Sequence, residues 1–347
     1  MPSTEHRSPI LNFLQGRLSA VLLVALPLVL FLVSLTLGRF EISLGEIIRI
    51  IGSTFQPSLA ADIPEMAQKL VLRIRVPRIL AAMLIGAGLG VTGTAFQGIF
   101  KNPLVDSNIL GVTSGAGFGA ALALLLVRPM WQVQLSAFVF GLLAVGLAFF
   151  GSRLYRSSPI LVLTLMGILV GSLFNSLTSL LKYVADPLDA LPAITFWLLG
   201  SLASITWEDI PMLASITVLG SGFLWFVRWR LNVLSLGDSE AKSLGMNPNQ
   251  LKLGIIAASA LVTAMAVSVA GVIGWVGLVI PHAGRILVGP DHRRLIPASI
   301  SLGAVFMLVI DDISRTLLPG EVPIGVLTGI LGVPLLIALL RKNRTGW

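Results

Sequence analysis

PRILAAMLIGAGLGVTGTAFQGI, residues 77–99, is the stretch that decides what kind of protein this is. After Arg78 it contains no charged residue, and a helix of this length can cross the roughly 30 Å hydrocarbon core of a bilayer. Glycines recur in it at helical spacing, as at Gly86 and Gly90, and such small residues let helix backbones approach closely in lipid. The stretch therefore predicts a membrane-spanning helix that packs tightly against its neighbours.

The rest of the chain has the same character. Of its 347 residues 55% are hydrophobic and 12% are charged, whereas a soluble domain carries about 25% charged residues. Apolar length predicts nine further spans, if we count a helix at 280–288 that is too short to cross unless its neighbours bury it. It also predicts one short re-entrant helix at 194–203, which cannot cross alone. We therefore predict an all-α polytopic membrane protein, a single domain over 1–347 with about ten transmembrane helices. The nine further spans are 18–37, 108–127, 133–151, 159–181, 210–227, 252–273, 280–288, 295–314 and 323–340.

The net charge of +8 does not indicate a nucleic-acid partner, because the cations form no patch. They lie in short loops on one side of the predicted spans, as at Arg153, Arg228 and Arg293, whereas Asp62 and Asp186 lie on the other side. Cytoplasmic loops carry the excess of Lys and Arg. The pattern therefore predicts a multi-pass protein of the cytoplasmic (inner) membrane with both termini in the cytoplasm.

No motif for catalysis or metal binding is found. The chain lacks cysteine, no lysine follows a glycine as a phosphate-binding loop requires, and His282 has no evident partner. Ionisable residues are absent from the middle of nearly all spans, although an ion-coupled transporter usually needs them there. Asp311 and Asp312 lie toward an outer end, where Arg315 can pair with them. Uphill transport would therefore draw its energy from a separate ATPase, and a secondary transporter is the less favoured alternative.

Two polar segments are candidate contact surfaces. The loop 231–251 is predicted to form a short helix that ends at Gly245 and a second helix that begins at Pro248; it is either a partner-docking knob or a plain connector. At the outer start of the 77–99 span, Arg75 and Arg78 oppose both the positive-inside trend and the helix dipole. Local pairing with Asp62 or Glu65 would compensate for them, and so would an acidic partner.

Four motifs carry a resemblance to a known family. The sequence resembles the permeases of ABC importers for ferric siderophores, haem and cobalamin, over about 40–341. The motifs are RIRVPRILAAMLIGAGLGVTGTAFQGIFKNPLVDSNILGVTSGAGFGA (73–120), LSLGDSEAKSLGM (234–246), GVIGWVGLVIPHAGRILVGPDHRRLIPAS (271–299) and EVPIGVLTGILGVPLLIALL (321–340). The resemblance implies a cobalamin-importer-like fold and a homodimer in the bilayer. It also implies two cytoplasmic ATPase subunits, which carry ATP and Mg, and an extracytoplasmic binding protein; this chain itself would bind no cofactor or metal.

The resemblance also assigns roles to residues. It implies that the ATPase docks on a coupling loop with Leu236, Gly237, Asp238, Ala241, Leu244 and Gly245. It implies that the binding protein meets Arg75, Arg78 and Arg315. The translocation path would be lined by Gly167, Gly171, Asn175, Ser176, Ser179, Trp197, Gly200 and Ser201, with a cytoplasmic gate at Ser157 and Ser158. The cargo would be a metal chelate or large cofactor, with an oxyanion such as molybdate as the alternative.

Overall fold

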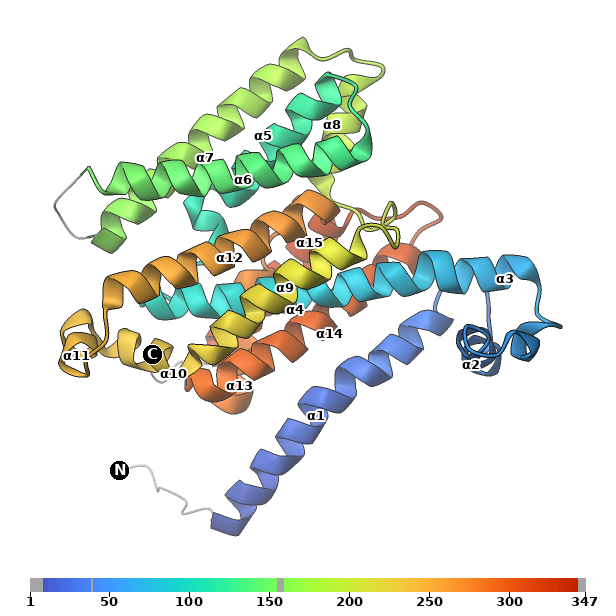
Figure 1. The fold of residues 1–347 in the computed structure, drawn as a ribbon, viewed down its shortest axis with the longest axis horizontal. Coiled ribbons are helices and arrows are strands. Elements are labelled where there is room, and N and C mark those ends of the chain that lie inside the picture. Colours follow the sequence, from blue (N-terminus) through green and yellow to red (C-terminus); the bar gives the residue numbers. More distant parts are fainter. Residues whose placement is uncertain (1–8, 39, 155–158, 343–347) are drawn as a thin grey trace.

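The computed structural model describes residues 9–38, 40–154 and 159–342, and every regular element in this part of the chain is helical (Figure 1). A π-helical turn, Leu70–Arg75, leads into α4, and a 3-10 helix, Ser107–Leu110, leads toward α5. The helices are α1 Pro9–Thr36, α2 Leu44–Gly52, α3 Glu65–Lys69, α4 Val76–Phe100, α5 Val112–Leu125, α6 Met130–Ser152, α7 Pro159–Val184, α8 Ala190–Leu199, α9 Ile210–Phe226, α10 Arg228–Leu236, α11 Asp238–Ser243, α12 Pro248–Ala270, α13 Val276–Val288, α14 His292–Thr316 and α15 Ile324–Lys342.

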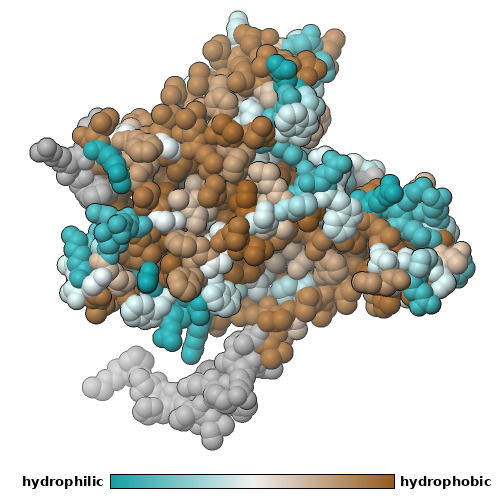
Figure 2. All heavy atoms as spheres, in the orientation of Figure 1, coloured by the Kyte–Doolittle hydropathy of each residue, from teal (hydrophilic) through white to brown (hydrophobic). Residues whose placement is uncertain are grey.

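The all-α polytopic prediction is confirmed, because each of the ten predicted spans corresponds to a helix. By length and composition five helices of the described chain can cross a membrane, and α9 with α10, bent by 56°, makes a sixth. The remaining spans correspond to the apolar segments Val21–Thr36 of α1 and Ile324–Leu339 of α15 and to the shorter helices α5 and α13. Apolar side chains cover the middle of the molecule, and polar ones gather near α10 and α11 and near α2 and α3 (Figure 2). The helices therefore run from one polar end to the other.

The two predicted short helices have different bounds in the structure. The re-entrant helix predicted at 194–203 ends at Leu199, because Gly200 turns the chain with a φ of +76°. The short helix predicted at 280–288 begins at Val276 instead, so Pro281 and His282 lie in its interior. Pro281 has no N–H to donate to the Gly277 carbonyl. Gln97 of α4 donates its Nε2–H to this carbonyl at 3.3 Å, so a neighbouring helix compensates for the lost bond.

The centre of the molecule is the pair α4 and α14. A methyl group on Gly86 would lie 2.1 Å from the Gly303 carbonyl oxygen, and one on Gly303 would lie 2.1 Å from the Gly86 oxygen. Farther along the same pair, Thr94 and Ser299 share a hydrogen bond of 2.7 Å between their hydroxyls. Only glycine permits backbones to lie this close. The two helices therefore pack as one unit.

The helices α5, α6 and α7 form a layer that lies apart from α14 and α1 in Figure 1. They are less enclosed than the centre: 78% of the apolar window in the helix that contains α4 is buried, against 28% in α7. Between this layer and the centre lies Ser107, whose hydroxyl accepts a 2.8 Å bond from Thr263 of α12. Much of α7 is therefore available for contacts outside this chain.

Candidate functional site

The loop 231–251 forms a compact projection at one polar end. Gly237 separates α10 from α11, and Gly245, with a φ of +74°, ends the short helix as predicted. The predicted second helix is not a separate short one: it is the beginning of α12, which continues from Pro248 to Ala270. Leu236 and Leu244 are 70% and 61% exposed, while Ala241 is buried. The projection thus presents two large apolar side chains to solvent at a polar end.

Two polar links tie this projection to the spans. Lys252, in the first turns of α12, donates to both carboxylate oxygens of Asp238 at 2.6 and 2.7 Å. Asn232 of α10 donates to Asp291, the N-cap residue of α14, at 2.6 Å and accepts from the His292 N–H at 2.9 Å. Burial opposes ionisation of Asp291, but the Arg293 N–H and the Asn232 amide hold the pKa of this carboxyl below its usual range. A displacement of the projection would therefore reach both α12 and α14.

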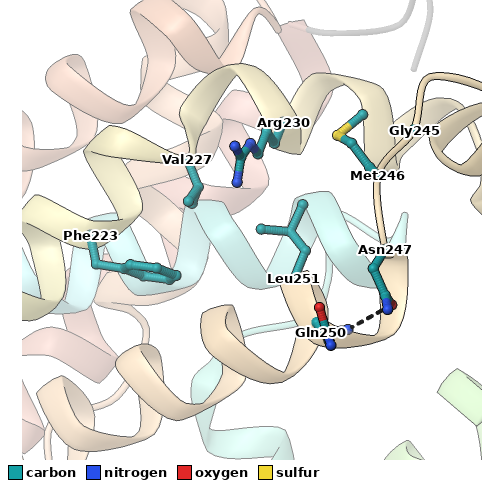
Figure 3. A pocket seen from close by; sticks show the side chains of 8 residues that line it. All are labelled: Phe223, Val227, Arg230, Gly245, Met246, Asn247, Gln250 and Leu251. Carbon is teal, nitrogen blue, oxygen red and sulfur yellow. Dashed lines mark hydrogen bonds between the residues drawn. The ribbon is translucent and has the colours of Figure 1, made fainter.

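A cavity of about 440 Å³ lies beside the projection (Figure 3). Phe223, Val227 and Leu251 form its apolar part, and Arg230 and Gln250 belong to its polar part. The lining comes from the end of α9 and the start of α10, from the turn 245–247 and from the first turn of α12. An apolar wall with a few polar groups is the lining that suits a side chain or small ligand from outside.

A network of buried charges lies at the opposite end of α4 and α14. Arg78 donates Nε–H to Asp311 at 2.8 Å and its two terminal N–H groups to both oxygens of Glu321 at 2.7 and 2.9 Å. Arg315 pairs with Asp311 at 3.1 Å and with Asp312, as predicted for the two acids. The Asp311 side chain is fully buried, and Glu321 is 36% exposed. Glu321 is therefore the most accessible member of these ion pairs.

The predicted docking arginines are thus enclosed. Arg75, Arg78 and Arg315 have exposed fractions of 4%, 4% and 8%. Arg75 donates to the backbone oxygens of Leu35 at 2.6 Å and of Phe40, so it anchors the end of α1. The suggested local partners have other contacts, because Asp62 pairs with Arg49 and Glu65 with Lys69. Compensation for Arg78 comes instead from residues more than 200 positions away in the chain.

The predicted path residues fall into two groups. Asn175 and Ser179 of α7 line a cavity of about 430 Å³ between α5, α7 and α8. Gly167 and Gly171 serve close packing, since a methyl group on Gly167 would lie 2.2 Å from the Ile109 oxygen. The other predicted residues do not line this cavity. Ser176 is exposed, Trp197 is half-buried, and Gly200 and the N–H of Ser201 contact the end of α12 and the turn after it; the gate residues Ser157 and Ser158 lie outside the described residues.

The same cavity contains residues that sequence reasoning missed. Thr113 and Ser114 come from the start of α5, and Thr178 and Lys182 come from α7. Asn175, Thr178, Ser179 and Lys182 recur at the i, i+3, i+4, i+7 spacing of one helix face. That spacing could have identified the α7 residues of the cavity from the sequence. The α5 residues could not be identified in this way, because the spacing within one helix does not show which other helix packs beside it.

Metal binding by side-chain clusters has no support in the described residues. No group of three or more His, Cys, Asp or Glu residues that could hold an ion is found in that part of the chain. The buried acids Asp311 and Asp312 pair with arginines instead.

Comparisons with known proteins agree with this architecture. The profile of the FecCD transport family matches residues 25–342. The molybdate import system permease protein MolB of Haemophilus influenzae is 39% identical over 314 residues, which cover 90% of this chain and 92% of MolB. The hemin transport system permease protein HmuU of Yersinia pestis is 37% identical over 283 residues, which cover 79% of this chain and 83% of HmuU.

A solved structure supports the same relation. It is described as an inward-facing conformation of a metal-chelate type ABC transporter, and it superposes with a TM-score of 0.83 at 38% identity. The superposition covers 92% of this chain and 97% of that one. The resemblance predicted from four motifs is confirmed: the chain belongs to the FecCD transport family, as a membrane permease.

Proposed function

We propose that this permease is the membrane-spanning subunit of an ATP-driven importer in the cytoplasmic membrane. It works as a homodimer, with two ATPase subunits on the coupling loop, a binding protein at the outer face and both termini in the cytoplasm. The observation that carries the proposal is the pair α4 and α14, which joins the Asn232 and Asp291 link at one end to the Arg78 and Asp311 network at the other. Docking on either face would thereby act on the same helices.

The mechanism follows from these contacts. Closure of the ATPase pair on ATP would displace α11, and the bond from Lys252 to Asp238 would pass that motion to α12. The Asn232 bonds would pass it to α14. Because α4 and α14 pack as one unit, they would move as a rigid body and switch the path between outward and inward access.

For the cargo, we propose an anion delivered by the binding protein. The names of two relatives indicate different classes of cargo: MolB is a molybdate permease and HmuU is a hemin permease. The cavity beside Asn175 contains one lysine and no carboxylate, and this lining favours negative charge. A tetrahedral oxyanion of the molybdate type is therefore the leading candidate, and a metal chelate is the second.

Uptake into vesicles tests the proposal. The permease would be reconstituted with its ATPase and binding protein, and accumulation of molybdate, ferric siderophore, haem and cobalamin would be measured with and without ATP. We expect ATP-dependent accumulation of molybdate. Accumulation without ATP would contradict the importer assignment, and ATP-driven uptake of a chelate alone would assign the second class of cargo.

Replacing Leu244 with alanine should uncouple the ATPase. Burial of an exposed leucine side chain against a partner contributes about 1.5–3 kcal/mol, so its loss should weaken ATPase docking roughly tenfold. Docking affinity and ATP-driven uptake would both be measured. The matched control is Leu219→Ala, where the leucine is 73% exposed and lies within the span α9 rather than in the loop. Equal behaviour of the two variants would argue against the coupling assignment.

Replacing Glu321 with glutamine tests docking of the binding protein at Arg75, Arg78 and Arg315. Charge reversal of the buried arginines would disturb the fold, whereas Glu321 is partly exposed and shares Arg78 with Asp311. If a carboxylate of the binding protein competes for Arg78, the variant should bind that protein several-fold more tightly. Surface plasmon resonance would measure the affinity, with Glu65→Gln as control. An unchanged affinity would count against Arg78 as the contact.

A further inference from the structure

The cavity between α5, α7 and α8 has a lining with one sign of charge. Lys182 is its charged residue, and hydroxyl and amide groups supply the rest of its polar surface. The ion pairs found among the described residues do not include Lys182. Asp186, one turn farther along the chain, instead accepts the N–H groups of Leu188 and Asp189 at 2.8 and 3.1 Å. The cation at this cavity therefore lacks a carboxylate partner among the described residues.

The free hydrogen-bond donors of the cavity come from two helices. The hydroxyls of Thr178 and Ser179 donate to carbonyls of their own helix at 2.8 and 3.0 Å. Thr113 donates to the side chain of Asn108. Ser114 of α5 and the Asn175 amide of α7 make no such internal bond among the described residues. Together with the Lys182 ammonium, these groups can donate to an oxygen-rich ligand.

The size and spacing of the site limit the ligand. Asn175 and Lys182 are seven residues apart, which is about 10 Å along a helix. The cavity volume of about 430 Å³ holds a small hydrated ion. A ligand with acceptor oxygens on all sides and a negative charge uses every free donor, whereas a cation would meet Lys182. One cation with neutral donors binds weakly, which suits a path from which the cargo must leave.

We propose that this cavity is a transient binding site for a tetrahedral oxyanion. Lys182 selects for negative charge, and Ser114 and Asn175 donate to the oxygens. The site rests on the proposed function, because it names the step at which the permease itself discriminates its cargo. The site also includes Ser114 of α5, a residue that the predicted translocation path did not contain.

The test uses the complete transporter, with ATPase and binding protein, in vesicles and in lipid nanodiscs. The variants are Lys182→Gln, Lys182→Arg and, as matched control, Lys69→Gln, since Lys69 pairs with Glu65 away from the cavity. Initial uptake of molybdate would be measured by elemental analysis, and ATPase activity would be measured alongside. Equilibrium dialysis of molybdate against the transporter without binding protein gives a second readout.

Loss of the charge-assisted contact should lower molybdate uptake and binding roughly tenfold in Lys182→Gln. Lys182→Arg should recover most of the uptake and binding, because it preserves the charge, whereas Lys69→Gln should stay near wild type in uptake, binding and ATPase activity. If the wild-type transporter takes up molybdate and Lys182→Gln takes it up equally well, the proposed site is refuted. A wild-type transporter that takes up no oxyanion would instead overturn the proposed cargo. An equal loss in Lys182→Arg with the protein still folded would refute charge selection, since arginine preserves the charge.

Discussion

Replacing Asp311 with asparagine is expected to destabilise the permease by about 3 kcal/mol, because it removes a buried carboxylate that Arg78 and Arg315 share. This value is at the lower end of the range for a broken buried pair, since Arg78 keeps Glu321 and Arg315 keeps Asp312. The Asp311 carboxylate is fully buried, accepts a hydrogen bond from Arg78 at 2.8 Å and forms an ion pair with Arg315 at 3.1 Å. An amide of the same size retains the shape but not the charge. Unfolding of the purified protein in mixed micelles would measure the loss as a lower midpoint of denaturation.

The control for Asp311 is the exposed pair of Arg49 and Asp62. Their side chains are 44% and 69% exposed, so water replaces most of the lost attraction. Asp62→Asn should change the free energy of unfolding by at most about 1 kcal/mol. If Asp311→Asn is as mild as this control, the buried network contributes little to stability and the outer end of α14 is held by packing alone.

Replacing Gly303 with leucine is expected to prevent α4 and α14 from packing. Even the first carbon of a side chain would lie 2.1 Å from the Gly86 oxygen, and the obstructing atom belongs to the backbone and cannot rotate away. Overpacking of a close-packed core costs about 1–3 kcal/mol or more, and leucine adds four carbons at this point. Folded permease recovered from membranes, measured by size-exclusion chromatography, should fall to a small fraction of wild type.

The matched control for Gly303 is a glycine on another span that faces open space. A side-chain carbon at Gly222 of α9 would have no heavy atom within 4 Å. Gly222→Leu should therefore yield folded protein close to the wild-type amount. Comparable loss in both variants would indicate that glycine is needed for insertion into the membrane, and would contradict a specific role in the contact of α4 with α14.

The spans could be predicted because each depends only on its own residues. A run such as 252–273 is costly to expose to water wherever it lies in the fold, so hydropathy alone identifies α12. The boundaries of α8 and α13 were less accurate, because Gly200 and Trp275 adopt positive φ angles that depend on packing against other segments. The predicted range 280–288 begins too late, because Pro281 lies inside α13 and its missing bond is compensated by Gln97, which is distant in sequence.

In the candidate sites too, contacts between residues close in sequence could be predicted and contacts between distant residues could not. Arg315 was identified as a partner of Asp311 and Asp312 because the three lie within one turn of helix. Arg78 was noticed as an anomaly, but its partners lie more than 200 residues away, and only the packing of α4 against α14 brings them together. Lys182 passed unnoticed because a lysine near the end of a span is usually a solvated anchor.

The sequence alone determined that the chain lies in a lipid bilayer, that it is helical, where its spans are and which family it belongs to, because hydropathy and motif residues are properties of short segments. Tertiary structure alone decided which charges are compensated, which glycines are contacts and where a polar cavity lies. Those properties depend on distances between segments far apart in the chain. At Gly303, for example, close approach is visible only once Gly86 lies opposite.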